Sequence, residues 1–254
     1  MLSSNSSSIL AMRIGISINK SYRSLFSSME KLSSGLKINR ASDNPAGLVI
    51  SEQLRAQIAS LGQEIKNIDA NMNKYATADA MVGVMREQLV NMRELAVGAA
   101  NTAFNSPEAQ IAYQRSGELL AESYNRQIEN AEYNGSKLFD GSEGSVAAID
   151  KMANIDFSTA ATVEASIVEI DKAMAQLDTV QIEIGAKQKN EFEAMRASKM
   201  ITRENLIAAE SSLRDTDFAS EFINMIKSSL QMKVGLALMA HSKINAQTVL
   251  NIFA

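Results

Sequence analysis

The residue types that most often carry out chemistry are scarce in this chain. It has one histidine, His241, and no cysteine, so neither a thiolate zinc site nor a cysteine nucleophile is available. Carboxylates are plentiful, but those such as Glu183, Glu191 and Glu193 are spread along helical stretches as solvated charge. A lone histidine on an apolar segment is more often a packing residue than a ligand. We therefore expect no catalytic residues, no cofactor and no metal site.

Motifs for catalysis and nucleotide binding are also missing. The chain contains no GxSxG, HExxH, GxGxxG or phosphate-binding glycine loop. Asn5 and Asn134 match the glycosylation pattern only at chance level. The sequence therefore predicts a protein that is not an enzyme.

The composition instead favours long helices. Trp is absent, aromatic residues make up 5% of the chain, and there are 14 Met and only 2 Pro. The polar start, MLSSNSSS, is unlike a signal peptide, and no apolar run approaches the roughly 20 residues that cross a bilayer, so no membrane insertion is expected. Residues 1–40 carry six basic side chains against one acidic, whereas residues 41–217 are strongly acidic. We interpret this as terminal helices segregated from an acidic body rather than as nucleic-acid binding.

Apolar residues recur at helical spacing at both ends of the chain, which predicts that the two ends pair although they lie about 200 residues apart. The stripes are Ile14, Ile18, Tyr22, Leu25, Met29, Leu32 and Leu36 in the N-terminal segment, and Phe222, Ile226, Leu230, Val234, Leu238, Val249 and Leu250 in the C-terminal one.

A third stripe predicts a helix over about residues 45–101, opened by Pro45 at the first helical position. Apolar residues follow one another in alternating steps of four and three, with one extra step of three to Ala78. They are Leu54, Ile58, Leu61, Ile65, Ile68, Met72, Tyr75, Ala78, Val82, Met85, Leu89, Met92, Ala96 and Ala99. Such a seam is typical of a coiled coil.

Two further helices and a region of turns complete the body. Ser106 and Pro107 predict a helix start, and that helix runs to about residue 132. Residues 133–145 are rich in Asn and Gly and predict turns or a short hairpin. Residues 146–161 lack helical period and are expected to form an exposed tip, and residues 142–161 are expected to tolerate insertions. In the alternative interpretation, Ile149, Met152, Ile155 and Phe157 pack back as a lid. Helical period returns over 162–214.

The predicted fold is therefore all-α: an elongated, antiparallel, coiled-coil-like helical bundle with a short β-hairpin or turn region, plus paired terminal helices. Three segments are expected. They are an N-terminal helix and connector over 1–44, a helical body over 45–214 and a C-terminal helix over 215–254.

Residues 31–51 read KLSSGLKINRASDNPAGLVIS, and four shorter motifs follow in order along the chain. These five stretches resemble motifs of the bacterial flagellins. The matching positions include Ser33, Ser34, Gly35, Leu36, Ile38, Asn39, Asp43, Gly47, Arg93, Glu94, Leu95, Asn134, Gly135, Glu204, Asn205, Leu206, Arg214 and Asp215. The chain departs from the family at Ser212 and Ala246, where the family has Arg and Pro. It is identified as a short flagellin without the outer domains of longer members.

This resemblance implies a self-assembling subunit of the flagellar filament, exported unfolded by the flagellar type III route and built in at the growing tip. The terminal stripes would form the inner assembly interface. The filament would be extracellular, or periplasmic in a spirochaete. The implied partners are other copies of the chain, an export chaperone, and the cap and hook-junction proteins.

Recognition by Toll-like receptor 5 is expected to be weak or absent. In recognised flagellins, the helix that carries the RELAV run, here Arg93–Val97, supplies a leucine and a basic residue four positions before it. Those positions here are Leu95 and Asn91, and an amide cannot make the bond that a guanidinium makes.

Two other functions remain open at this point. A hook–filament junction protein shares similar end helices, and a secreted helical-bundle binding module belongs to a different class. Filament formation by the purified protein distinguishes a filament subunit from a binding module.

Overall fold

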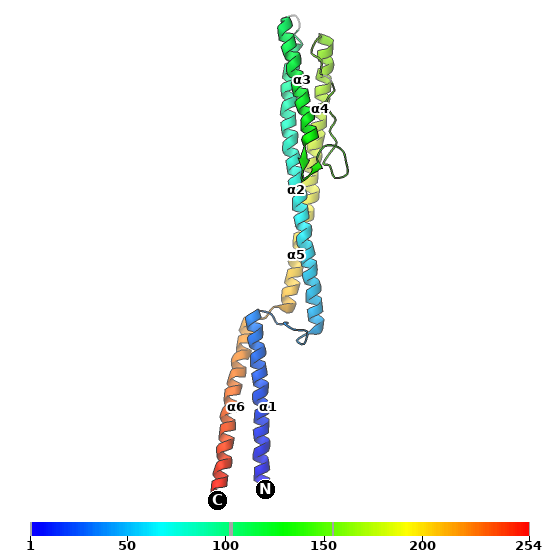
Figure 1. The fold of residues 1–254 in the computed structure, drawn as a ribbon. Coiled ribbons are helices and arrows are strands. Elements are labelled where there is room, and N and C mark those ends of the chain that lie inside the picture. The colour runs from blue at the N-terminus through cyan, green and yellow to red at the C-terminus, as the bar shows by residue number, and fades with distance from the viewer. Residues whose placement is uncertain (1, 102–103, 154, 254) are drawn as a thin grey trace. The chain divides into compact units, whose positions relative to one another are not determined.

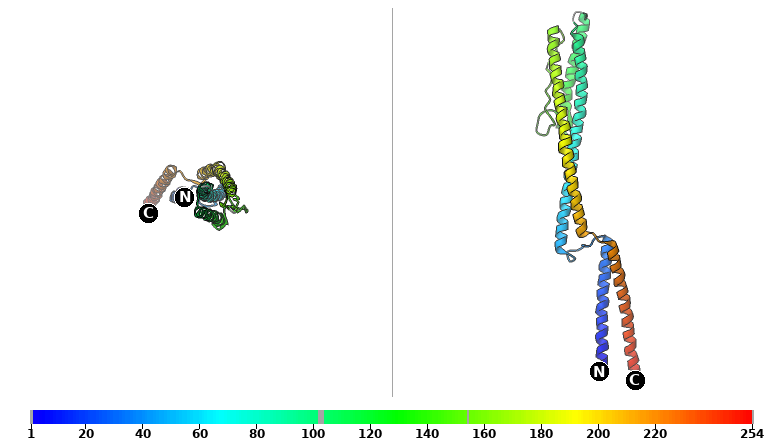
Figure 2. Two further views of the ribbon diagram at one scale, coloured as in Figure 1. Left: turned by 90° about the horizontal axis from the view of Figure 1, so that it is seen from above. Right: turned by 180° about the vertical axis from the view of Figure 1, so that it is seen from behind.

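The computed structural model describes residues 2–101, 104–153 and 155–253, and the side chains within 9–101, 104–153 and 155–241. Helices make up 80% of the chain, which confirms the all-α prediction. They are α1 (Leu2–Ser34), α2 (Pro45–Ala99), α3 (Pro107–Asn130), α4 (Ala160–Ala186), α5 (Glu193–Arg214) and α6 (Phe218–Phe253). A π-helical segment, η1 (Lys187–Phe192), joins α4 to α5 without a break. Figures 1 and 2 show their arrangement.

The chain divides into two compact units. The first holds residues 1–60 and 202–254, and the second holds residues 61–201. The helices α2 and α5 each have residues in both units. The segments 1–44, 45–214 and 215–254 that the sequence suggested stay a prediction.

In the second unit, α2, α3 and α4 lie side by side around an apolar core (Figures 1 and 2). The α2 seam predicted from Ala78 to Ala99 is buried at every position, and each of its members is 0% exposed. From α4 the core takes Val163, Ile170, Leu177 and Ile184, spaced by seven residues. The periodicity of the sequence therefore identified the faces that meet in this core.

The start of α3 and the hairpin that follows it form as their sequences predict. Ser106 caps α3 by accepting a hydrogen bond from the Ala109 amide at 3.2 Å, and Pro107 occupies the first turn. Strands β1 (Glu132–Tyr133) and β2 (Ser136–Lys137) pair antiparallel across Asn134 and Gly135. These two residues have φ of 50° and 79°, the positive values that a tight hairpin turn requires.

The segment 146–157 is not the exposed tip that its lack of period suggested; that expectation is wrong and the alternative lid is confirmed. Its apolar side chains Val146, Ile149, Met152, Ile155 and Phe157 are at most 8% exposed. Side-chain amides on α3 bind its backbone: the Asn125 amide group pairs with Met152, and Gln110 and Gln114 bind around Phe157. We call this segment the strap.

In the first unit, α1 and α6 pair antiparallel with their free ends at the same end of the pair (Figure 1). The predicted pairing of the termini is therefore confirmed. Small residues are the most deeply buried ones between the two helices: Ser21, Ser28 and Ser228 are buried. Gly235 lies so close to Ile18 that a Cβ atom there would be 2.7 Å from the Ile18 side chain.

Candidate assembly interface

Two connectors join the terminal helices to α2 and α5, and they bind each other. Residues 35–44 lead from α1 to α2, and residues 215–217 lead from α5 to α6. The Lys37 amide donates to the Arg214 carbonyl at 2.6 Å, and the Thr216 amide donates to the Gly35 carbonyl at 2.9 Å. Two of the five family motifs, about 180 residues apart in sequence, therefore meet in a short antiparallel bridge.

Side chains of the first motif fold the longer connector. The Asp43 carboxylate accepts hydrogen bonds from the backbone amides of Arg40 (2.9 Å) and Asn39 (3.1 Å). These two bonds favour the ionised form and lower the pKa of Asp43. The Asn39 amide group in turn donates to Ser34 Oγ at 2.8 Å.

Gly47 is required where the connector enters α2. Its amide donates to Asn44 Oδ1 at 2.9 Å, and a Cβ atom would lie 2.6 Å from Asn44 and 2.8 Å from Ile38. Ile38 is 3% exposed and anchors the connector against this turn.

Arg214 fixes the bridge to the first turns of α2. Its guanidinium donates to Glu52 Oε1 at 2.8 Å and to Ser51 Oγ at 3.5 Å, while its carbonyl accepts the Lys37 amide. The bond from Arg214 lowers the pKa of Glu52. One residue therefore connects α2, α5 and the residues that follow α1.

The predicted terminal stripes are only partly turned toward each other. On α1, Ile14, Ile18, Leu25 and Leu32 are half-buried, whereas Tyr22 and Met29 are 58% and 53% exposed; Leu36 is half-buried in the connector that follows α1. On α6, the predicted residues from Phe222 to Leu238 are 49–61% exposed. Val249 and Leu250 lie outside the described side chains. Whether these residues form the assembly interface stays a prediction at this stage.

On α6 the surface that pairs with α1 was missed, although the sequence carries a signal for it; on α1, Ile14, Ile18, Leu25 and Leu32 of the predicted stripe do lie on the paired surface. Steps of three and four link the half-buried or buried residues Met225, Ser228, Met232, Gly235 and Met239 on α6. The same steps link Ala11, Ile14, Ile18, Ser21, Leu25, Ser28 and Leu32 on α1. On α6, Ser228 and Gly235 occupy every second position of this series. The prediction relied on large apolar residues, so it selected the neighbouring, exposed face of α6.

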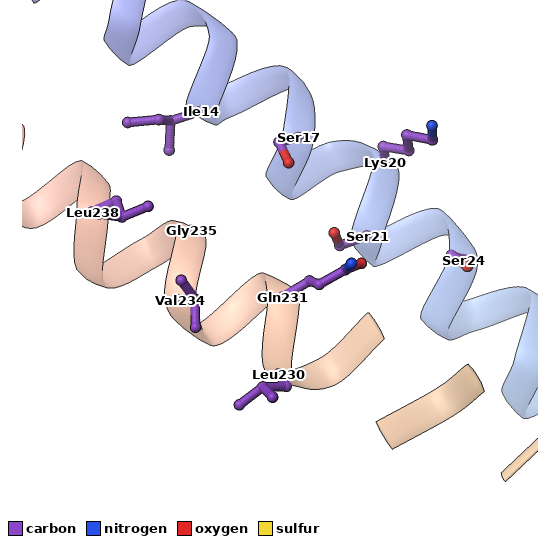
Figure 3. A pocket seen from close by; sticks show the side chains of 10 residues that line it. All are labelled: Ile14, Ser17, Lys20, Ser21, Ser24, Leu230, Gln231, Val234, Gly235 and Leu238. Atoms are coloured by element: carbon purple, nitrogen blue, oxygen red, sulfur yellow. The ribbon is translucent and has the colours of Figure 1, made fainter. Parts of the chain in front are cut away.

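A groove of about 500 Å³ runs between the two helices. Figure 3 shows Gln231 reaching across it toward Ser21. The groove is lined by Ile14, Ser17, Lys20, Ser21, Ser24, Leu230, Gln231, Val234, Gly235 and Leu238. Within the described side chains it combines apolar walls with hydroxyl groups and holds no carboxylate.

The remaining motif positions lie elsewhere. Arg93 pairs with Asp171 of α4 at 2.7 Å, which raises the pKa of the Arg93 guanidinium. Glu94 is exposed, and Leu95 packs partly against the core of the second unit. On α5, Glu204 and Asn205 are exposed and Leu206 is half-buried. Asn134 and Gly135 make the hairpin turn.

Among the described residues, no cluster of His, Cys, Asp and Glu could hold a metal ion. In the same part of the chain, no helix combines the length and apolar character needed to cross a membrane.

Comparisons with known proteins agree with the motifs. The bacterial flagellin N-terminal helical region matches residues 4–144, and the bacterial flagellin C-terminal helical region matches residues 167–253. A flagellin of Halalkalibacterium halodurans is 30% identical, over 94% of each chain. A flagellar filament 33 kDa core protein of Treponema phagedenis is 28% identical, over 99% of each chain. A crystal structure of Bacillus cereus flagellin has a TM-score of 0.48 and 17% identity, covering 53% of this chain and 88% of that one.

The fold and its terminal helices define a structural helical protein. The chain belongs to the bacterial flagellin family, whose members are not enzymes and polymerise with copies of themselves into the flagellar filament used for motility. Residues 145–166 are all that separates the two matched regions, so this is a short form of the family.

Proposed function

We propose that the subunit joins its neighbours in the filament through the outward face of the paired terminal helices. The observation that supports this is the placement of the large apolar side chains. The seam between α1 and α6 uses Ser21, Ser28, Ser228 and Gly235, which leaves the larger side chains about half exposed. We call the exposed set the outer face; it includes Ile16, Tyr22, Phe26 and Met29 on α1, and Phe222, Ile223, Ile226, Leu230, Val234, Leu236 and Leu238 on α6.

Burial of this face by neighbouring subunits would favour assembly. Fully burying a large apolar side chain is worth roughly 1.5–3 kcal/mol, so covering the exposed half of one gives roughly 1 kcal/mol. Eleven such side chains therefore offer on the order of 10 kcal/mol per subunit before the entropy cost of association is subtracted. Because the contact joins one face to a different surface of the next copy, it continues as an open helical polymer.

The connectors have a supporting role in this proposal. The bridge between residues 35–37 and 214–216, with Arg214 and Asp43, sets where α1 and α6 begin. A pair of helices that starts from a fixed bridge presents the outer face in one arrangement, which a regular polymer needs.

The further partners follow from the family. We propose that the chain is exported unfolded with an export chaperone and is placed at the filament tip next to cap and hook-junction proteins. The buried serines of the α1–α6 seam support this order of events, because burying a hydroxyl group gains less than burying an apolar side chain, and neighbours that cover the outer face add to the stability of the pair.

The experiment that tests the assembly proposal compares two variants of α6. The double substitution Phe222→Asp and Ile226→Asp places charges on the outer face, where both side chains are about half exposed in the free subunit. We expect unchanged helicity of the monomer by circular dichroism and no filaments by electron microscopy. Asn224→Asp, an exposed position on the same helix, is the control and should polymerise. Normal filaments from the double variant would exclude the outer face as the assembly surface.

We also propose weak activation of Toll-like receptor 5. Asn91 is exposed on α2 and carries an amide at the position where recognised flagellins have a basic residue, and Arg93 is paired with Asp171. Replacing Asn91 by Arg should increase activation of receptor-expressing cells by purified protein, whereas Asn91→Gln should not. Strong activation by the unmodified protein would contradict this proposal.

A further inference from the structure

The π-helical segment η1 lies at a change in the spacing of buried residues along α4 and α5. Before it, buried residues recur every seven positions at Val163, Ile170, Leu177 and Ile184. After it, the buried or half-buried residues Phe192, Lys199, Leu206 and Leu213 again recur every seven. The interval between Ile184 and Phe192 is eight. One extra residue is therefore accommodated between them.

The extra residue decides which side of α5 is covered. In an uninterrupted α-helix with seven-residue spacing, Ile184 would be followed on the seam by Glu191, Ser198, Asn205 and Ser212, and all four of these residues are exposed. A π-helical turn contains one residue more than an α-helical turn. It therefore absorbs an insertion that would otherwise rotate the following helix by about 100°.

The shifted positions make the contacts with α2. Phe192 is 9% exposed and meets Tyr75 edge to face, with ring centroids 5.0 Å apart. Arg196 pairs with Asp69 at 2.7 Å, and Lys199 pairs with Glu64 at 2.7 Å. Lys187, the first residue of η1, places its ammonium group 5.6 Å from the centre of the Tyr75 ring.

The seam of α2 is irregular at the same level. Met72, Tyr75 and Ala78 follow one another in two successive steps of three, whereas steps of four and three alternate on both sides. An insertion of three residues in a seven-residue pattern rotates the apolar seam around the helix. Beyond Ala78, α2 packs in the core with α3 and α4; before Tyr75, Asp69 and Glu64 of α2 pair with Arg196 and Lys199 on α5.

We propose that residues 72–78 and 187–192 form a packing joint. The π turn accommodates one inserted residue in the continuous helix α4–α5. Because of this insertion, the helix packs in the apolar core before the joint and forms ion pairs with α2 after it. The edge-to-face pair of Tyr75 and Phe192 lies at this level. The insertion is separable from the rest of the helix, because removing one residue restores an interval of seven between Ile184 and the phenylalanine.

The test compares two deletions of one lysine each in the full-length monomer. Lys189 lies in η1 and Lys172 lies in regular α4, and both side chains are exposed. Deleting Lys172 shifts Val163, Ser166 and Ile170 out of phase with Leu177. It should lower the Tm by more than about 5 °C. Deleting Lys189 should leave the Tm unchanged or raised, because the π turn becomes an α turn with the contacts of Phe192, Arg196 and Lys199 in place. The deletion also removes the Lys189–Glu193 ion pair, which is exposed and of the kind that contributes little to stability.

A second measurement reports on the π turn itself. Hydrogen exchange of the backbone amides between Lys187 and Glu193 should slow in the Lys189 deletion, because a regular α turn is better bonded than a π turn. A loss of Tm equal to that of the Lys172 deletion would overturn the proposal. Unchanged exchange of these amides would overturn it as well. Neither measurement depends on polymerisation, so the outcome is separate from that of the assembly test.

Discussion

Gly117 lies in the middle of α3, where the ring of Phe157 occupies the space that a side chain would need. A Cβ atom at this position would be 2.4 Å from Phe157 Cε2, and Phe157 is fully buried. The backbone around the ring is held by Gln110 and Gln114, so the ring has little room to retreat. Glycine inside a helix costs about 1 kcal/mol relative to alanine, and here it allows the strap to close.

Replacing Gly117 by Ala should therefore lower the free energy of unfolding, although alanine is the better helix former. Overpacking in a core costs about 1–3 kcal/mol, which outweighs the gain in helix propensity of about 1 kcal/mol. Adding Phe157→Leu should restore part of the loss, while Phe157→Leu alone should destabilise. Urea unfolding of the parent, the two single variants and the double variant measures the coupling between the two sites. Additive changes in the free energy of unfolding would contradict the predicted steric contact.

Asp43 gives the connector a dependence on pH. Its folded-state pKa lies below its unfolded value, because the amides of Arg40 and Asn39 bond to the carboxylate. The stabilisation from these bonds is therefore complete above a pH of about 4 and is lost as the pH falls through the folded-state pKa. The NMR shifts of the Arg40 and Asn39 amides should move together, with a midpoint below the ordinary pKa of an aspartate. The Asp43→Asn variant should remove this transition; a midpoint at or above the ordinary aspartate pKa in the parent protein would show that the bonds do not hold the carboxylate.

At the scale of elements, the strap and the loop before it differ in their tolerance of insertions. Residues 141–144 are exposed, and Gly141 and Gly144 have φ of 72° and 101°. The strap that follows is buried and bonded to α3. A small folded domain inserted after Glu143 should leave the thermal unfolding of the subunit unchanged, because loop length costs little entropy.

The matched insertion between Asp150 and Lys151 should destabilise the subunit, since it separates Ile149 from Met152 within the buried strap. Differential scanning calorimetry of the two fusions measures the difference. Equal stability of both fusions would mean that the strap contributes little to the core.

These elements also show what the sequence could and could not reveal. Seven-residue spacing located the α2 seam, because the core positions there carry large apolar residues. The strap has no helical period, and its burial depends on Gly117 and on amide side chains of α3. Because these residues are distant in sequence, no local pattern predicts the burial. On α6, spacing was again present, but Ser228 and Gly235 hold the seam while larger residues point outward. Apolar content and burial diverge in this helix because its large side chains stay exposed in the free subunit.

The hairpin was predictable for a different reason. Asn134 and Gly135 are the residue pair that a two-residue turn with positive φ requires, and their conformation depends on local sterics alone. The connectors were recognised as a motif, but their mutual bridge was not, since it joins residues 35–37 with 214–216.

For the whole molecule, the exposed apolar side chains of α1 and α6 imply a particular response to temperature. Removing apolar surface from water near room temperature is favoured by entropy and lowers the heat capacity, so the attraction weakens on cooling. Subunits that meet through the outer face should therefore show a higher critical concentration at 5 °C than at 25 °C. Sedimentation of filaments equilibrated at both temperatures measures it, and van't Hoff analysis should give an endothermic elongation step. Cold would then release subunits that remain folded in their second unit, so that a filament stored on ice shortens without any chain being denatured.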